Sequence, residues 1–326
     1  MAGSQRATDA SVSKPWTIVG QGLAGTCLAW ELWDHGITFR ILDREKGGSS
    51  RVAAGLINPV TGKNFEPTPG IAALLPEATT FYQKLESRLQ TRLWHPLPIL
   101  RLAQDDKEWR KMLAKCQRPD IACWLADAQP LEATGWLGAL ELRGGGRLDT
   151  RAFLDTSRGF FLRHGIYEHK EVPPGAHGNL IWCDGAAGLI TGRHGPHRCA
   201  KGEILTILAP HWNQTHIRIG AGGWLVPLGD GSFKAGATYQ WDPLDECPTA
   251  AGREKVSTIA HRLGGDGNFE ITAHQAGIRP ILRRSEPAIG QLDDGSWFIN
   301  GLGSKGSLTA PTIARLLAEQ LKKSAE

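Results

Sequence analysis

The start of the chain alternates between apolar and glycine-rich segments in a way that predicts a strand, a tight turn and a helix in direct succession. A short apolar run at residues 16–19 precedes three glycines within residues 20–25, and apolar positions then recur at helical spacing as far as Gly36. Residues 37–42, rich in β-branched and aromatic side chains, form a second predicted strand that Asp43 closes. This order of strand, helix and strand is typical of a parallel α/β sheet.

The remaining pattern predicts alternating helices and strands around one long loop. Small, polar and turn-forming residues fill positions 49–70, which we expect to form this loop, and long loops in compact domains are usually functional. The strands expected between residues 203 and 239 are short and joined by glycine-rich turns, as in an antiparallel sheet. Further helices are expected at 76–93, 105–116, 150–164 and 309–322, and further strands at 98–103, 180–185, 203–208, 225–227, 233–239 and 297–300.

Gly20, Gly22 and Gly25 have the spacing GxGxxG between the first strand and the first helix. Glycines so placed permit a sharp turn, close approach of the backbone to a diphosphate and tight packing of helix on strand. The start of the helix adds free N–H groups. Asp43, about 20 residues further on, is suited to accept hydrogen bonds from an adenosine ribose. An ordinary tight turn with an exposed aspartate is the alternative, but the joint context favours a dinucleotide site.

A second GxGxxG motif occurs at residues 301–306, after a predicted strand and before a predicted helix. Too few residues follow it for a second nucleotide-binding unit. Its N–H groups at a helix start are nevertheless suited to an anionic group, and a plain glycine turn is the alternative.

Arg279 lies in an apolar, strand-like segment. A buried guanidinium is costly without a partner, so we expect it to meet a carboxylate in a bidentate arrangement. Either a substrate or an Asp or Glu of the protein can supply that carboxylate.

Composition narrows the class of protein. With 326 residues, 41% of them hydrophobic, and 40 glycines, the chain can form a large core with many tight turns. The net charge is +4 and the basic residues are scattered, so binding of nucleic acid is permitted but not indicated.

Six cysteines lie far apart without metal-like spacing, which predicts reduced thiols, no metal site and a cytoplasmic location. Polar residues 1–14 predict a flexible leader, and no segment is apolar enough to span a membrane.

Together these residues resemble the D-amino-acid oxidase and glycine oxidase family of FAD enzymes, over residues 16–319. The resemblance begins at the first glycine motif with Asp43 and Arg44, and it is closest at residues 300–306. That last segment is also similar to the oxidase domain of the bifunctional enzyme that completes carboxymethylaminomethyl-uridine in tRNA. The other matching segments follow in the family's order at 49–55, 183–187, 201–203, 226–239, 277–280, 287–290 and 310–311.

The resemblance implies an α/β fold with two interleaved domains. One is a Rossmann-like FAD-binding domain, and the other is a substrate domain built on a mixed or antiparallel sheet. We expect the FAD-binding domain to comprise residues 15–75, 145–205 and 280–326, and the substrate domain to comprise residues 76–144 and 206–279.

By the same resemblance Arg279 holds a substrate carboxylate, and residues 303–308 contact the pyrimidine edge of the flavin. At Lys305 close relatives usually have arginine. Lysine keeps the positive charge but cannot form the two parallel hydrogen bonds of a guanidinium, so it is suited to contact the flavin or oxygen instead. Arg279 and Lys305 are therefore the catalytic candidates. The expected FAD-binding residues are Gly20, Gly22, Leu23, Ala24, Gly25, Asp43, Arg44, Ser49, Ser50, Ala54, Gly55, Val172, Gly185, Gly303, Ser304, Lys305, Gly306, Ser307 and Leu308.

The expected reaction is oxidation of the C–N bond of an amino acid or secondary amine that bears a carboxylate, by hydride transfer to flavin N5. Oxygen or another electron acceptor would then reoxidise the flavin. Two alternatives stay open: a tRNA wobble-uridine side-chain oxidase, and a flavin-binding protein without catalytic turnover. The expected partner is a small amine or amino acid, with tRNA as the partner under the first alternative.

Overall fold

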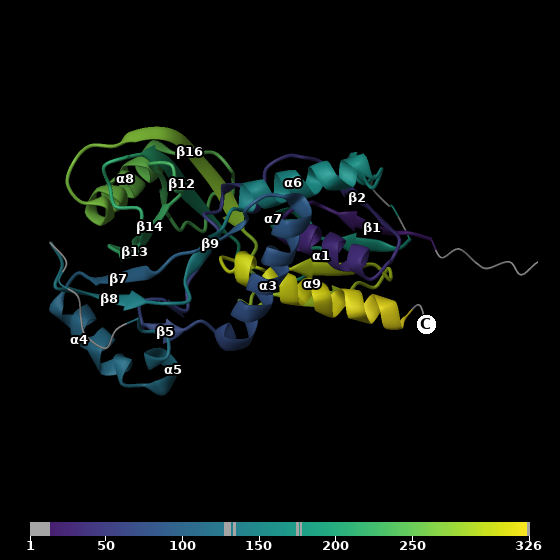
Figure 1. Ribbon diagram of the computed structural model, residues 1–326. Helices are drawn as coiled ribbons and strands as arrows, with labels where there is room; N and C mark the ends of the chain where they lie inside the picture. The colour runs from purple at the N-terminus through teal and green to yellow at the C-terminus, as the bar shows by residue number, and fades with distance from the viewer. Residues whose placement is uncertain (1–13, 127–131, 133–134, 174–175, 177, 325–326) are drawn as a thin grey trace, which may run out of the picture.

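Two sheets, each covered by helices, lie side by side in the molecule (Figure 1). One is mostly parallel and the other mostly antiparallel, which confirms the α/β fold class expected from the sequence. Residues 1–13 of the predicted leader lie outside the described part of the chain. The computed structural model describes residues 14–126, 132, 135–173, 176 and 178–324.

The first sheet has six strands in the order β10-β2-β1-β11-β18-β17, and every neighbouring pair except β17 and β18 is parallel. The carboxyl ends of the parallel strands therefore meet along one edge, which is where open α/β sheets bind their ligands. The strands are β1 (Trp16–Val19), β2 (Phe39–Asp43), β10 (Tyr167–His169), β11 (Leu180–Trp182), β17 (Ala288–Gln291) and β18 (Trp297–Asn300).

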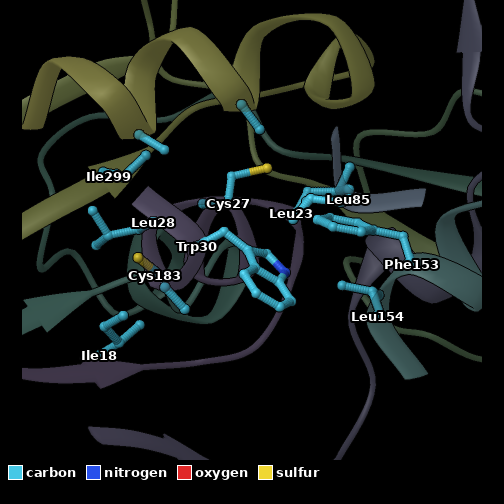
Figure 2. Close-up of a cluster of buried hydrophobic side chains, with 14 of the residues drawn as sticks. Ile18, Leu23, Cys27, Leu28, Trp30, Leu85, Phe153, Leu154, Cys183 and Ile299 are labelled. Atoms are coloured by element: carbon cyan, nitrogen blue, oxygen red, sulfur yellow. The ribbon is translucent and has the colours of Figure 1, made fainter. Parts of the chain in front are cut away.

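Helix α1 is buried around most of its circumference, between the six-stranded sheet and its neighbouring helices. Its Trp30 is fully buried (Figure 2). The indole N–H donates to the Ser157 hydroxyl at 2.9 Å. This packing fixes the amino end of α1 at the carboxyl edge of the sheet. The helices of this half are α1 (Leu23–Asp34), α3 (Ile71–Leu89), α6 (Thr150–Arg163), α7 (Ala186–Ile190) and α9 (Gly306–Lys323).

The second sheet has seven strands in the order β16-β12-β15-β14-β13-β7-β8, antiparallel except between β13 and β7. Helix α8 (Ala250–Gly264) covers one face, where Leu205, Leu225 and Phe233 pack against it. Side chains of alternate residues point to the opposite face of the sheet, which lines the cavity described below. The strands are β7 (Ile99–Ala103), β8 (Gly138–Leu142), β12 (Ala200–Leu208), β13 (Ile217–Gly220), β14 (Gly223–Pro227), β15 (Ser232–Gly236) and β16 (Glu270–Arg279).

The segment expected as one loop, residues 49–70, contains a helical turn and three two-residue strands. Strands this short show no periodicity, because pairing with distant residues rather than local pattern defines them. Helix α3 also begins earlier than predicted, so that Pro76 lies inside it rather than at its start. The small elements are α2 (Ser49–Val52), β3 (Leu56–Ile57), β4 (Val60–Thr61), β5 (Glu66–Pro67), β6 (Trp94–Pro96), α4 (Asp106–Cys116), α5 (Pro119–Ala122) and β9 (Gly146–Leu148).

Two of the predicted domain limits fall inside single elements, at residue 75 in α3 and at residue 205 in β12. Strand β12 belongs wholly to the seven-stranded sheet, although the predicted boundary at residue 205 divides it. The domain limits themselves stay a prediction.

Candidate active site

A first cavity, the edge cavity, lies at the carboxyl edge of the parallel sheet and has a volume of about 350 Å³. Gly20, Gly22, Leu23 and Ala24 line it. Gly20 has φ +100°, and a Cβ there would lie 2.7 Å from the Cys183 carbonyl oxygen. The predicted glycine turn is therefore open to a cavity and has no room for side chains.

The amino end of α1 is available to an anion. Its N-cap, Gly22, supplies no side-chain cap, and the first turn holds no acidic residue. The Leu23 N–H donates to the Ser50 hydroxyl at 3.1 Å. Uncapped N–H groups and the positive end of the helix dipole suit a diphosphate here, so the residues present fit the ADP half of FAD.

Asp43 and Arg44 also line the edge cavity, at the end of β2, and Gly185 lines it from the turn after β11. The ribose contact expected of Asp43 stays a prediction. Val172 follows β10 and is not among the described residues that line this cavity. Its expected contact with FAD also stays a prediction.

A strap from the other half of the molecule crosses the edge cavity, and the sequence did not indicate it. Leu244, Asp245 and Glu246 line the cavity. The Gly48 N–H donates to Glu246 Oε1 at 2.8 Å, and the buried Lys201 ammonium pairs with Asp245 at 2.5 Å. These contacts tie the strap to both halves.

A second cavity, the central cavity, has a volume of about 500 Å³ and lies between the two sheets. It adjoins the edge cavity, because Leu23, Ser49 and Ser50 line both. The structure therefore brings the two glycine motifs to two adjoining cavities. The predicted residues found on this wall are Ser49, Ser50, Ala54, Gly55, Arg279, Gly303, Ser304, Lys305, Gly306, Ser307 and Leu308.

Gly303 begins the turn into α9 with φ +58°, a conformation that favours glycine. Lys305 is the N-cap residue of α9, and its side chain is partly buried in the cavity wall. Burial lowers the pKa of the Lys305 ammonium. The turn thus offers helix N–H groups and a cation to the same space.

Arg279 projects from the end of β16 over Gly202, where a Cβ would overlap its guanidinium. It donates to the carbonyl oxygens of Lys201 at 3.3 Å and Thr238 at 3.2 Å, and its guanidinium carbon lies 5.0 Å from the centre of the Tyr239 ring. Burial lowers the pKa of Arg279. No carboxylate of the described residues forms an ion pair with it, so the alternative of an internal carboxylate partner is not realised there.

The sheet face of the central cavity carries residues that the sequence did not single out. Register places Ile219 beside Trp224, and Gly236 leaves the room that the Trp224 ring occupies. Ile204 and Arg101 line the same wall. They come from four separate strands, so only the pairing of strands identifies them as neighbours.

Lys234 holds two residues of the wall of this cavity in place through hydrogen bonds. Its ammonium donates to the carbonyl oxygens of Val52 at 2.9 Å and Ala53 at 2.8 Å, and both of these residues line the cavity. Burial lowers the pKa of Lys234 to about 8. A buried cation therefore positions the end of α2 beside the space between the glycine motifs.

Within the described residues no cluster of His, Cys, Asp and Glu has the geometry of a metal site. Nor does any helix of that part of the chain have the length and apolar character needed to span a membrane.

Solved structures with this fold include several enzymes. Glycine oxidase from Bacillus cereus superposes with a TM-score of 0.78 at 17% identity, covering 96% of each chain. Iminodiacetate oxidase from a Chelativorans species gives a TM-score of 0.77 at 20% identity, covering 94% of this chain and 95% of the other. At such identities the likeness shows the fold.

Curated relatives are of two kinds. The tRNA 5-methylaminomethyl-2-thiouridine biosynthesis bifunctional protein MnmC of Marinobacter nauticus is 24% identical over 94% of this chain. The chain spans about half the length of the MnmC proteins it matches, 55% in this case. The putative thiamine biosynthesis oxidoreductase ThiO of Rhizobium etli is 25% identical over 92% of this chain and 96% of its own length.

The expected resemblance is confirmed by the sequence profile of one family, described as FAD dependent oxidoreductase, which matches residues 16–320. The chain belongs to this family of FAD-dependent oxidoreductases.

Proposed function

We propose that this oxidoreductase oxidises the C–N bond of an amino acid or secondary amine that bears a carboxylate. The observation that carries the proposal is Arg279, a buried guanidinium in the wall of the central cavity with no carboxylate partner among the described residues. Such a group is suited to a bidentate contact with a substrate carboxylate.

FAD, when bound, supplies the two-electron acceptor for the α-carbon hydride. The residues that would hold its ADP half line the edge cavity, above all the glycine turn with Asp43. Those that would hold its ring system lie on the loops that include Ala54 and Gly303. These two sets line adjoining cavities that share Leu23, Ser49 and Ser50, which supports a single extended cofactor.

The chain's own contribution is binding, orientation and exclusion of water. Arg279 would fix the carboxylate, while Ile204 and Trp224 would shield the reacting carbon from water. No Asp, Glu or His of the described residues lines this cavity, so neither a carboxylate nor an imidazole stands beside the substrate to take its proton. The substrate amine would therefore bind in its neutral form.

The test is anaerobic reduction of the bound flavin by a panel of amino acids, sarcosine and other secondary amines. The proposal expects the yellow flavin to bleach with carboxylated amines and not with the same amines lacking the carboxylate. Equal bleaching by amines with and without a carboxylate would contradict the proposal. Because oxygen is absent, the result does not depend on whether oxygen or another acceptor reoxidises the flavin.

A second candidate is oxidation of a carboxymethylamino side chain on tRNA, favoured by a basic and aromatic surface. The Arg198 N–H donates to the Ile281 carbonyl at 2.7 Å, which brings Arg198 close to the exposed Arg283 and Arg284. The Arg198 guanidinium lies 5.5 Å from the ring of Trp241, which is 51% exposed. Basic residues scattered in sequence are thus gathered in space, and exposed aromatic rings suit base stacking.

The two candidates differ in the size of the substrate. Anaerobic flavin reduction by tRNA carrying the modification is to be compared with reduction by N-substituted glycines at equal concentration. A rate with tRNA that falls steeply with added salt would favour the second candidate, because phosphate contacts are salt-dependent. Reduction by small amines alone would exclude it.

A further inference from the structure

The wall of the central cavity carries a second arginine that the proposed reaction does not use. The side chain of Arg101, on β7, is 11% exposed and lines the cavity. Its Nη2 donates to Glu108 Oε1 at 3.0 Å, but its buried Nε has no hydrogen-bond partner within the described chain. A buried donor left unpaired costs free energy, so the contacts within the described chain do not fully satisfy this guanidinium.

Glu108, on α4, satisfies this arginine only in part. Its side chain is 27% exposed, and its other oxygen accepts from the Gln104 N–H at 3.1 Å. Burial lowers the pKa of Arg101 in spite of the opposing attraction of Glu108. The guanidinium therefore keeps the capacity to bind an acceptor from the cavity side.

Arg101 and Arg279 lie at opposite ends of the sheet wall. Strand pairing places Arg101 opposite Ile219 and Ile219 opposite Trp224, so these three residues form one row across β7, β13 and β14. Ile204 on β12 extends this wall of the cavity toward β16. Five strand-to-strand steps separate β7 from β16, which is about 24 Å on a flat sheet and less on a twisted one. The wall between the two arginines is apolar.

We infer that Arg101 is a specificity-determining residue that binds a second acceptor group, a carboxylate or a phosphate, at the far end of the substrate. The inference rests on the proposed function, because Arg279 must hold the carboxylate next to the reacting amine. The substrate class is then an N-substituted amino acid whose substituent is apolar or aromatic in its middle and anionic at its end. Free glycine and sarcosine are too short to reach both arginines.

The experiment compares anaerobic flavin reduction by N-alkylglycines with reduction by N-carboxyalkylglycines and N-phosphonoalkylglycines of increasing chain length. Each series is measured with the wild type, Arg101→Met and Glu108→Gln. At one chain length the wild type is expected to prefer an anionic end by about tenfold or more, as for other charge-assisted contacts. The phosphonate and carboxylate series show which anion the site takes.

The two variants are expected to move this preference in opposite directions. Arg101→Met abolishes it, so that N-alkylglycines and N-carboxyalkylglycines of equal length reduce the flavin at equal rates, whereas Glu108→Gln increases it because the competing carboxylate is gone. A purely structural Arg101–Glu108 pair would lower both series together, and that result would overturn the inference. A wild type with no preference at any length overturns it too. If no N-substituted glycine of any series bleaches the wild-type flavin, the proposed function fails and the inference with it.

Discussion

The two cavities of this protein are built in different ways. The part of the edge cavity that suits a diphosphate is backbone, at glycines of one short segment beside the amino end of α1. The sheet wall of the central cavity carries side chains such as Arg101, Trp224 and Arg279, which come from different strands of the seven-stranded sheet. The glycine turn is a local structure, whereas the sheet wall exists only after the sheet has formed.

This difference fits the two ligands that the cavities are suited to. A diphosphate is recognised by N–H groups whatever the rest of the molecule, so a short motif can serve every member of a family. A substrate is recognised by shape and by a few placed charges, which side chains on a sheet can vary independently. Changes in the edge cavity should therefore affect FAD binding, and changes on the sheet wall of the central cavity should affect the reaction.

The largest effect is expected from Arg279→Met. Loss of a buried cation that pairs with a substrate carboxylate costs about 4 kcal/mol, or about a thousandfold in the rate of flavin reduction at low substrate concentration. Bound FAD, measured by absorbance after desalting, should be unchanged. Arg279→Lys should recover part of the rate, since the charge stays and the fork is lost. A variant that loses its flavin would contradict the separation of the two cavities.

The next largest effect is expected in the edge cavity, from Gly25→Ala. A Cβ at this position would overlap the carbonyl oxygen of Gly20, so the turn must open and move its N–H groups. We expect the dissociation constant for FAD to rise about a hundredfold, which is roughly 3 kcal/mol. Gly36→Ala is the matched control, because Gly36 has φ +67° with no atom within 4 Å of a Cβ. It should cost about 1 kcal/mol of stability and leave FAD affinity intact.

The same contrast explains how much could be predicted from the sequence. The turn at residues 20–25, Asp43 and the second motif at residues 301–306 are local signals, and the structure places them around continuous cavities. Arg279 was identified because a lone arginine in an apolar strand needs a partner. The outer limits of the predicted strands and helices shifted by a few residues, as for α3.

The remainder could not be predicted, because it depends on pairing between distant segments. Arg101 and Trp224 look like ordinary alternating strand residues until β13 and β14 bring them to one wall. Glu246 lies in a turn-rich segment, and only its hydrogen bond to the Gly48 N–H places it over the edge cavity. The short strands within residues 49–70 likewise exist through their partners alone.

A smaller effect is expected from Asp43→Ala, which sharpens the comparison within the edge cavity. Here a side chain, rather than the backbone, would recognise the cofactor, by accepting hydrogen bonds from the adenosine ribose. Removing hydrogen bonds to a charged acceptor costs about 1.5 kcal/mol, so FAD affinity should fall about tenfold. Asp43→Asn keeps one acceptor oxygen and should fall less. If the alanine variant binds FAD as tightly as the wild type does, Asp43 makes no contact with the ribose.

The smallest effect is expected where the two cavities join, at Lys234. Burial lowers the pKa of this ammonium to about 8, against an ordinary value of 10.5. Between these pH values the unfolded chain binds one more proton at this position than the folded protein does. The contribution of Lys234 to the free energy of unfolding therefore rises with pH in this window, by on the order of 1 kcal/mol per pH unit, and is constant below pH 8.

Urea unfolding of the FAD-saturated wild type and Lys234→Met from pH 7 to 10 measures this contribution as a difference, in which other titrating groups cancel. A difference that stays flat above pH 8 would mean that the ammonium keeps its ordinary pKa and is not buried in solution. The variant also leaves the Val52 and Ala53 carbonyls without their donor. Because these residues line the central cavity and lie at the end of α2, where the two cavities join, both FAD affinity and flavin reduction should weaken modestly. No change confined to one cavity is expected to do this.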